Sequence, residues 1–170
     1  MGYGGASLGS IADRAEVSKA LLVTYFGSKD GLYGACAQRA GTNLADRIEA
    51  VITQDFTAGD MALRTLAAIF TGLEARPLDW NVLNDRTAPH DSPGGACARA
   101  QRQRIEEQAT RAVASLKQLS DLDADNAELL TGVWSGAVSS VVSWWLHHPD
   151  RTPAEMTARC ATVVSALRTL

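Results

Sequence analysis

The sequence predicts an all-α fold, and three observations support this. Aromatic residues make up only 6% of the chain while alanine and leucine are abundant, which favours helices over sheet. Apolar residues recur at intervals of three and four, as they do on one face of an α-helix. Glycine and proline separate these segments and are densest in Thr87 to Gly95. With 170 residues, 46% of them apolar, the chain is long enough for a full helical core.

The first two expected helices are short and adjacent. The first begins near Leu8 and has two small residues, Ala12 and Ala15, that let another helix approach closely. Its pattern breaks at Glu16, and Ser18 then has the hydroxyl expected of a helix N-cap. Two short helices joined by a tight turn form a helix-turn-helix, so the sequence favours DNA binding.

The second short helix has one apolar side, and its other side is the one that would enter a major groove. The residues expected on the inward side are Leu21, Leu22, Tyr25 and Phe26. Gly27 ends this helix, Ser28 is the expected N-cap of a long third helix, and Lys29 falls in the first turn of that helix. Exposed amides and a cation at the start of a helix can together bind a phosphate of the DNA backbone.

These residues resemble the DNA-binding head of the tetracycline-repressor (TetR) family of transcriptional regulators. The resemblance rests on segments in the family's order and spacing, namely Gly2-Tyr3, Ala6-Ser7-Leu8, Ile11-Ala12, Val17-Ser18-Lys19, Leu22, Tyr25-Phe26, Ser28-Lys29 and Leu32. It implies a helix-turn-helix domain over residues 1–47 and a helical domain for ligand binding and dimerisation over residues 48–170. The implied DNA contacts are Ser18, Lys19, Ala20, Thr24 and Tyr25 at the groove, with Ser7 and Lys29 on backbone phosphates.

The sequence departs from the family pattern at three places. Family members carry another helix before the pair that corresponds to Gly2-Tyr3, so we expect a head that lacks its first helix in this chain. Glu16 stands where the family often has glycine, and a left-handed conformation there would cost on the order of 1 kcal/mol. Val23 replaces an aromatic phosphate contact and cannot donate a hydrogen bond.

The charge of the chain gives little general attraction to nucleic acid. There are 16 basic and 19 acidic residues in total. Residues 1–47 contain five basic and four acidic side chains, a balance of plus one. Binding to a double-stranded DNA operator would therefore depend on a few placed side chains and on two heads acting together, and it would be sensitive to salt.

The last two expected helices favour a homodimer. Residues 125–148 are apolar over more than one stripe, so that helix must be covered on two sides. Thr152, Pro153 and Glu155 form a well-defined start for the final helix. In the resembled family two such helices pair with their symmetry mates, although an intramolecular core is the alternative. The expected interface residues are Val138, Val141, Val142, Trp145, Met156, Val163, Val164 and Leu167.

The resemblance also implies a small hydrophobic effector whose binding releases a repressor from its operator. The candidate lining residues are Phe70, Leu73, Trp80, Ile105 and Trp134. Each of them also fits an ordinary helical core. Ligand binding can change DNA affinity only if the ligand prefers one of two spacings of the heads.

Other functional classes have less support. The histidines His147 and His148 are adjacent and cannot grip one metal ion from one helix face, and no phosphate loop or nucleophile motif is present, so we expect neither an enzyme nor a cofactor. The remaining alternative is a dimeric protein that binds a small molecule or partner and whose DNA binding is weakened or lost. Three widely spaced cysteines, no signal peptide and no continuous apolar run predict a cytoplasmic protein without a membrane span.

Overall fold

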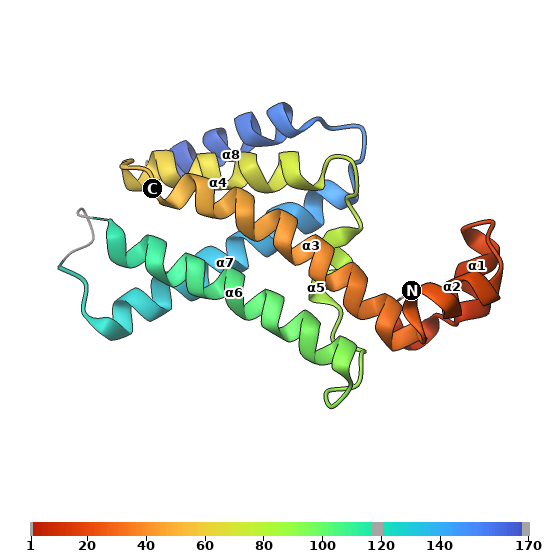
Figure 1. Ribbon diagram of the computed structural model, residues 1–170. Helices are drawn as coiled ribbons and strands as arrows, with labels where there is room; N and C mark the ends of the chain where they lie inside the picture. Colours follow the sequence, from red (N-terminus) through yellow and green to blue (C-terminus); the bar gives the residue numbers. More distant parts are fainter. Residues whose placement is uncertain (1, 117–120, 168–170) are drawn as a thin grey trace. The chain divides into compact units, whose positions relative to one another are not determined.

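The computed structural model describes residues 2–116 and 121–167, and every regular element within them is helical (Figure 1). The predicted all-α fold is confirmed. The elements are the 3-10 helix η1 (Tyr3–Gly5), α1 (Leu8–Arg14), α2 (Lys19–Phe26), α3 (Lys29–Ile52), α4 (Ala58–Leu73), α5 (Asp79–Asn84), α6 (Pro93–Ser115), α7 (Ala124–Leu146) and α8 (Pro153–Leu167).

The chain forms two compact units, each made of two stretches. Unit 1 comprises Met1–Thr42 and Leu78–Gln103, and unit 2 comprises Asn43–Pro77 and Arg104–Leu170. The helices α3 and α6 each contribute residues to both units. The division into domains of residues 1–47 and 48–170 stays a prediction about function.

Side-chain caps fix the ends of several helices at the predicted residues. The Ser18 hydroxyl accepts a hydrogen bond of 3.1 Å from the Leu21 amide at the start of α2. The Thr152 hydroxyl accepts from the Glu155 amide, and the Glu155 carboxylate accepts in return from the Thr152 amide at 2.9 Å. Both caps satisfy amides that have no partner inside their helix, which is why these short local motifs were readable from sequence.

The glycine- and proline-rich segment is shorter than predicted. The helix α6 begins at Pro93 rather than at residue 96, because proline suits the first turn of a helix and the Ser92 hydroxyl accepts from the Gly95 amide. At its other end α6 stops at Ser115. Residues 117–120 lie outside the described part of the chain.

In unit 1, α3 and α6 approach each other closely. A Cβ atom added at Gly41 would lie 2.5 Å from the Gln101 side chain. The core beside this contact is Tyr33, Ala37 and Ala98, and the ring of Tyr3 packs edge-on against Tyr33 at 5.2 Å between centroids. Small residues therefore let the two helices lie together.

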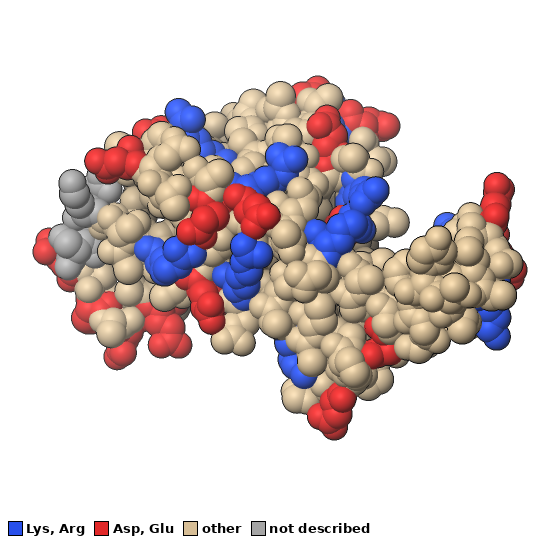
Figure 2. Space-filling model, viewed as in Figure 1, with Lys and Arg blue, Asp and Glu red and all other residues tan. Residues whose placement is uncertain are grey.

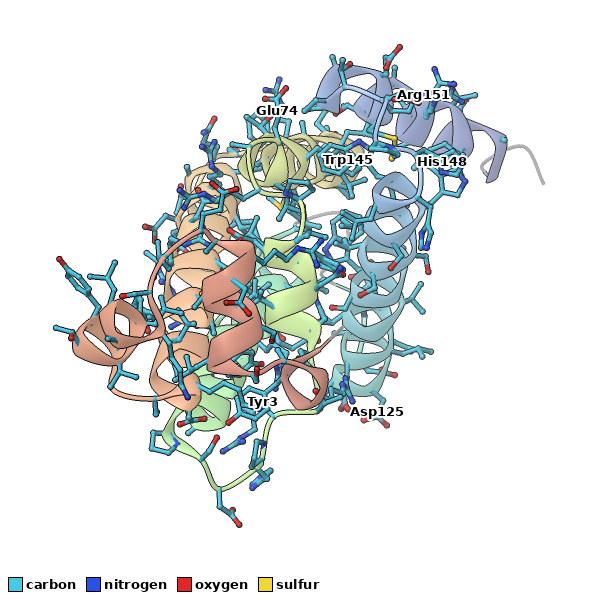
Figure 3. All side chains as sticks on the ribbon, turned by 90° about the vertical axis from the view of Figure 1, so that its right-hand side faces the viewer. Tyr3, Glu74, Asp125, Trp145, His148 and Arg151 are labelled. Atoms are coloured by element: carbon cyan, nitrogen blue, oxygen red, sulfur yellow. The ribbon has the colours of Figure 1, made fainter. Side chains whose placement is uncertain are left out.

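In unit 2, α4 packs against α8 around a fully buried phenylalanine. Phe70 has an exposed fraction of 0% and meets the indole of Trp145 edge-on, with 5.2 Å between ring centroids. The Trp145 Nε1 donates to the Arg151 carbonyl at 2.7 Å and so fixes the turn between α7 and α8, which Figure 3 shows together with His148. Phe70 and Trp145 thus form an aromatic contact within the core of this unit.

Glu49 joins α3 to α6 within unit 2. Its carboxylate accepts from the Arg111 guanidinium at 3.0 and 2.7 Å and from the Gln108 amide at 2.6 Å. The bonds from Arg111 and then Gln108 lower the pKa of Glu49 from 4.5 to about 2, against the opposing effect of burial. Because the folded pKa is depressed, this group stabilises the fold above about pH 4.5 and ceases to do so as the pH falls toward 2.

Candidate nucleic-acid interface

A tight turn joins α1 to α2, which pack against each other. Ala12 is buried in this region, and its carbonyl accepts from the Val17 amide at 3.0 Å. Glu16 lies inside the turn with a φ of 55°, in the left-handed region. The turn therefore needs the conformation for which glycine is best suited, and Glu16 adopts it at a cost of about 1 kcal/mol.

The exposed surface of α2 is wider than the sequence predicted. Tyr25 is 74% exposed and Leu21 is also exposed, so their predicted inward positions are wrong. Leu22 and Phe26 are partly buried, as expected for the inward side. A helix of eight residues with one partner helix covers a narrower stripe than four apolar residues suggest.

The predicted groove residues differ in how free their side chains are. Thr24 donates from its hydroxyl to the Ala20 carbonyl at 2.9 Å, and the Ser18 hydroxyl is occupied as a cap. Lys19 is exposed and makes no hydrogen bond or ion pair with the described residues. Together with Tyr25, Lys19 is the side chain of α2 with the most freedom to reach a partner.

The two predicted phosphate contacts already have partners inside the head. Ser7 forms a reciprocal capping box with Ser10 at the start of α1. The Lys29 ammonium donates to the carbonyls of Tyr3 and Ala6 at 3.1 and 3.0 Å, and it lies 4.1 Å from the centroid of the Tyr3 ring. Lys29 thus holds the N-terminal segment on the start of α3, and one of its three N–H donors remains for another acceptor.

Comparison with known proteins identifies this head. Residues 1–36 match the family model described as bacterial regulatory proteins, tetR family. The head of this chain is thus similar to the DNA-binding head of TetR regulators. The match covers η1, α1, α2 and the first two turns of α3.

Solved TetR structures share the fold of the whole chain. A TetR family transcriptional regulator, PfmR from Thermus thermophilus, has a TM-score of 0.73 at 17% identity, covering 92% of this chain and 83% of that one. A TetR-like transcriptional regulator from Rhodococcus sp. RHA1 has a TM-score of 0.69 at 21% identity, covering 94% and 82%. No curated protein sequence matches the chain at a significant level.

The TetR head ends α2 with a glycine whose conformation can be tested. Gly27 has a φ of 72°, and an added Cβ would meet no atom within 4 Å, so only the backbone opposes substitution. We expect Gly27→Ala to lower the free energy of unfolding by about 1–2 kcal/mol, the cost of a left-handed alanine. Urea denaturation measures the loss.

Gly59→Ala is the matched control for this substitution. Gly59 in α4 also has open space around an added Cβ, and its φ is not positive. We expect its replacement to leave stability unchanged or slightly raised, because alanine is the better helix former. Equal losses from the two substitutions would contradict the role assigned to the conformation of Gly27.

The helix α7 has two apolar sides, and they are not equivalent. Four of the predicted interface residues are buried within the chain, namely Val138, Val142, Trp145 and Met156. The outward apolar side chains of α7 are instead Leu129 at 66%, Val133 at 61% and Trp144 at 42% exposure. Sequence reasoning missed these three, although they follow one another at helical spacing.

The other predicted interface residues lie nearer the surface. Val163 of α8 is exposed, and Val141 and Val164 are partly buried. The side chain of Leu167 lies outside the described residues. Trp144 also stacks on the His148 ring, with 3.8 Å between centroids, and the Arg159 guanidinium lies 5.9 Å from the Trp144 ring.

The predicted effector residues fall in both units. Phe70 and Leu73 are fully buried in the core of unit 2, where Ile105 and Trp134 are partly buried. Trp80 is partly buried in unit 1. The sequence-based assignment of these residues to a ligand stays a prediction.

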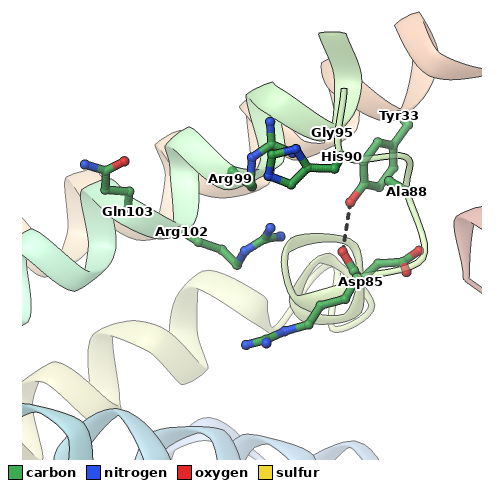
Figure 4. Close-up of a pocket in the computed structure, with 9 residues that line it drawn as sticks. Tyr33, Asp85, Ala88, His90, Gly95, Arg99, Arg102 and Gln103 are labelled. Atoms are coloured by element: carbon green, nitrogen blue, oxygen red, sulfur yellow. Dashed lines mark hydrogen bonds between the residues drawn. The ribbon is translucent and has the colours of Figure 1, made fainter. Parts of the chain in front are cut away.

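A pocket of about 520 Å³ lies within unit 1, and none of the five predicted effector residues lines it (Figure 4). Its lining includes Tyr33, Asp85, Arg86, His90, Arg99 and Arg102. Arginines on a polar helix such as α6 ordinarily form a solvated face, so their type alone does not indicate a pocket. One feature of the sequence could have indicated the pocket. It is a pair of arginines three residues apart, directly after a loop rich in glycine and proline.

Proposed function

We propose that the protein is a homodimeric, cytoplasmic repressor that binds a double-stranded DNA operator through α2 and is released by a small hydrophobic effector. The observation that carries this proposal is the exposed side of α2 in a TetR head. Lys19, Ala20, Thr24 and Tyr25 share this exposed helix, whose ends are fixed by Ser18 and Gly27. Such a helix suits readout of base edges in the major groove.

The uncovered side of α7 supports the homodimer. By length and composition α7 is apolar enough to cross a membrane, yet it is the only such helix in the described part of the chain, and 22% of that stretch is buried. A large exposed apolar surface is typical of an interaction site. In a TetR regulator, a second copy is the natural cover, because the two recognition helices must lie about 34–36 Å apart to read successive groove faces.

The side chains support the proposed effector less strongly than they support DNA binding. Trp80, Ile105 and Trp134 are partly buried and have surface left to contact a ligand. Phe70 and Leu73 are already fully buried in the absence of a ligand. An apolar, flat effector would suit an indole.

The test of DNA binding uses the full-length reading frame and the DNA that flanks its own gene. Fluorescence anisotropy at about 100 mM salt compares this DNA with a scrambled duplex of equal length. We expect the flanking DNA to bind at least about a hundredfold more tightly. If both duplexes bind weakly and equally, a selection from random duplexes decides between a distant operator and a head that no longer reads sequence.

Lys19 and Thr24 should affect DNA binding in different ways. We expect Lys19→Gln to weaken binding to all duplexes and to reduce the salt slope by about one charge, because Lys19 is a free cation. We expect Thr24→Val to change the preferred sequence instead, since the substitution removes a hydroxyl from the groove side. Anisotropy titrations at several salt concentrations measure both effects.

Arg76→Gln is the control, because it removes an exposed positive charge from unit 2. Its salt slope should equal that of the unaltered protein. A uniform loss across all sequences from both Lys19→Gln and Thr24→Val would contradict the separate roles.

A second candidate is a dimer that binds a small molecule or protein partner and no longer grips DNA. Figure 2 shows few charged side chains over α1 and α2 in the view drawn, and Val23 offers no hydrogen-bond donor. This candidate predicts that the selection from random duplexes yields no preferred sequence.

A further inference from the structure

The pocket of unit 1 has an excess of positive charge. Three arginines, Arg86, Arg99 and Arg102, line it together with a single carboxylate, that of Asp85. Figure 4 shows Arg99 and Arg102 projecting from α6, while the Asp85 carboxylate points away from them. The chemistry of this pocket therefore differs from that of an apolar effector site.

A single Asp85 carboxylate cannot neutralise three arginines: its hydrogen bonds go to other donors, and Arg102 is the one arginine of the pocket whose charge acts on it. It accepts from the Tyr3 amide, and from the amide and hydroxyl of Thr87 at 2.7 Å each. Burial acts to raise the pKa of Asp85, but the bonds from Thr87 and Tyr3 and the charge of Arg102 outweigh it, so the pKa lies below its ordinary value. Asp85 is thus an ionised group committed to the N-terminal segment.

The arginines themselves are incompletely partnered. The Arg102 guanidinium donates to the Leu83 carbonyl at 2.5 Å. Arg99 is partly buried and Arg86 is exposed, and neither makes a hydrogen bond or ion pair with the described residues. Several guanidinium groups around one pocket repel each other, and their planar donors fit carboxylate and phosphate oxygens.

We propose that this pocket binds a small anion that carries carboxylate or phosphate groups, as a site distinct from that of the hydrophobic effector. A volume of about 520 Å³ lies within the range of small-molecule sites. Tyr33 donates from its hydroxyl to the carbonyls of Val82 and Asp85 at 3.2 and 3.3 Å and so fixes one wall. The anion takes the guanidinium donors of Arg99 and Arg102.

The same loop that borders the pocket also holds the start of the head. Thr87 accepts at its hydroxyl from the Gly4 amide at 3.0 Å, next to the bond between Asp85 and the Tyr3 amide. The Tyr3 carbonyl in turn accepts from Lys29 at the start of α3. An anion that changes the position of this loop would therefore change the support of the helix-turn-helix, which gives the site a route to DNA affinity if the proposed function holds.

The test is isothermal titration calorimetry on the full chain without DNA. The probes are citrate and pyrophosphate at matched ionic strength, with glycerol as a neutral probe. We expect at least one anion to bind with one site per chain, and Arg99→Gln to weaken it about tenfold or more, because a hydrogen bond to a charged group is worth that much. Arg76→Gln removes an equal charge outside the pocket and should leave the affinity unchanged.

Three results would overturn the proposal. In the first, neither anion binds. In the second, the Arg99→Gln variant binds the anion as tightly as the unaltered protein does. In the third, Arg76→Gln weakens anion binding as much as Arg99→Gln does. Arg99 has no partner in the described residues, so Arg99→Gln should keep the thermal midpoint of the unaltered protein. If citrate binds more tightly, the natural anion carries carboxylate groups. If pyrophosphate binds more tightly, it carries phosphate groups.

DNA is the alternative source of phosphate for these arginines. If neither probe binds and Arg99→Gln weakens binding to every duplex, the arginines serve the DNA backbone and the small-anion site is excluded. Because the calorimetry contains no DNA, failure of the proposed repressor function would leave the anion result unaffected.

Discussion

Val133→Glu is expected to abolish the homodimer proposed above and leave a monomer. Val133 is 61% exposed on the outward side of α7, between the exposed Leu129 and Trp144. In a symmetric interface each copy would bring a carboxylate to the other, and like charges facing each other cost several kcal/mol. We expect the dissociation constant of the dimer to rise by at least about a hundredfold, as measured by sedimentation velocity.

The same substitution should weaken operator binding without touching the head. Two linked heads bind a palindromic operator with a high effective concentration, and a monomer loses that advantage. Thr71→Glu adds the same charge at an exposed position of α4 and is the control. If Val133→Glu stays dimeric at the concentrations at which the unaltered protein does, α7 is not the contact between copies.

Phe70→Ala is expected to lower the free energy of unfolding by about 3–5 kcal/mol. The ring is fully buried in unit 2, and its edge-on contact with Trp145 would be lost together with the burial of the phenyl group. Neighbouring helices can fill such a space only in part, so a cavity remains. Urea denaturation at one fixed protein concentration measures the loss.

Leu78→Ala is the control, because Leu78 is 66% exposed and should change stability by no more than about 0.5 kcal/mol. The result also bears on the effector. A loss below about 1 kcal/mol for Phe70→Ala would mean that the ring borders open space, which would favour a ligand cavity beside it.

The sequence contained enough information for the features that depend on local chemistry. The caps at Ser18 and Thr152 and the glycine stop at Gly27 involve residues no more than four positions apart. The order of the helices and the likeness of the head to TetR regulators were also predictable from the sequence. A hydroxyl or a missing Cβ decides such features with little help from the rest of the fold.

The features that depend on residues far apart in the sequence were harder to predict from the sequence. Both sides of α7 are apolar, so the pattern could not tell that Val138 is buried while Val133 is exposed. The pocket brings Tyr33 of α3 together with Asp85 and Arg99, which follow it by more than fifty residues. Only the close packing of α3 on α6 reveals that arginines of a polar helix share a pocket with that tyrosine.

The four tryptophans give this protein its own fluorescent reporters. Trp80 is the single indole of unit 1, so its emission reports on the unit that contains the anion pocket. Trp144 lies on the outward side of α7 and stacks on His148, where a second copy would shield it from water. Ligand binding and association can therefore be followed in the unlabelled protein, with Trp80→Phe and Trp144→Phe assigning each signal.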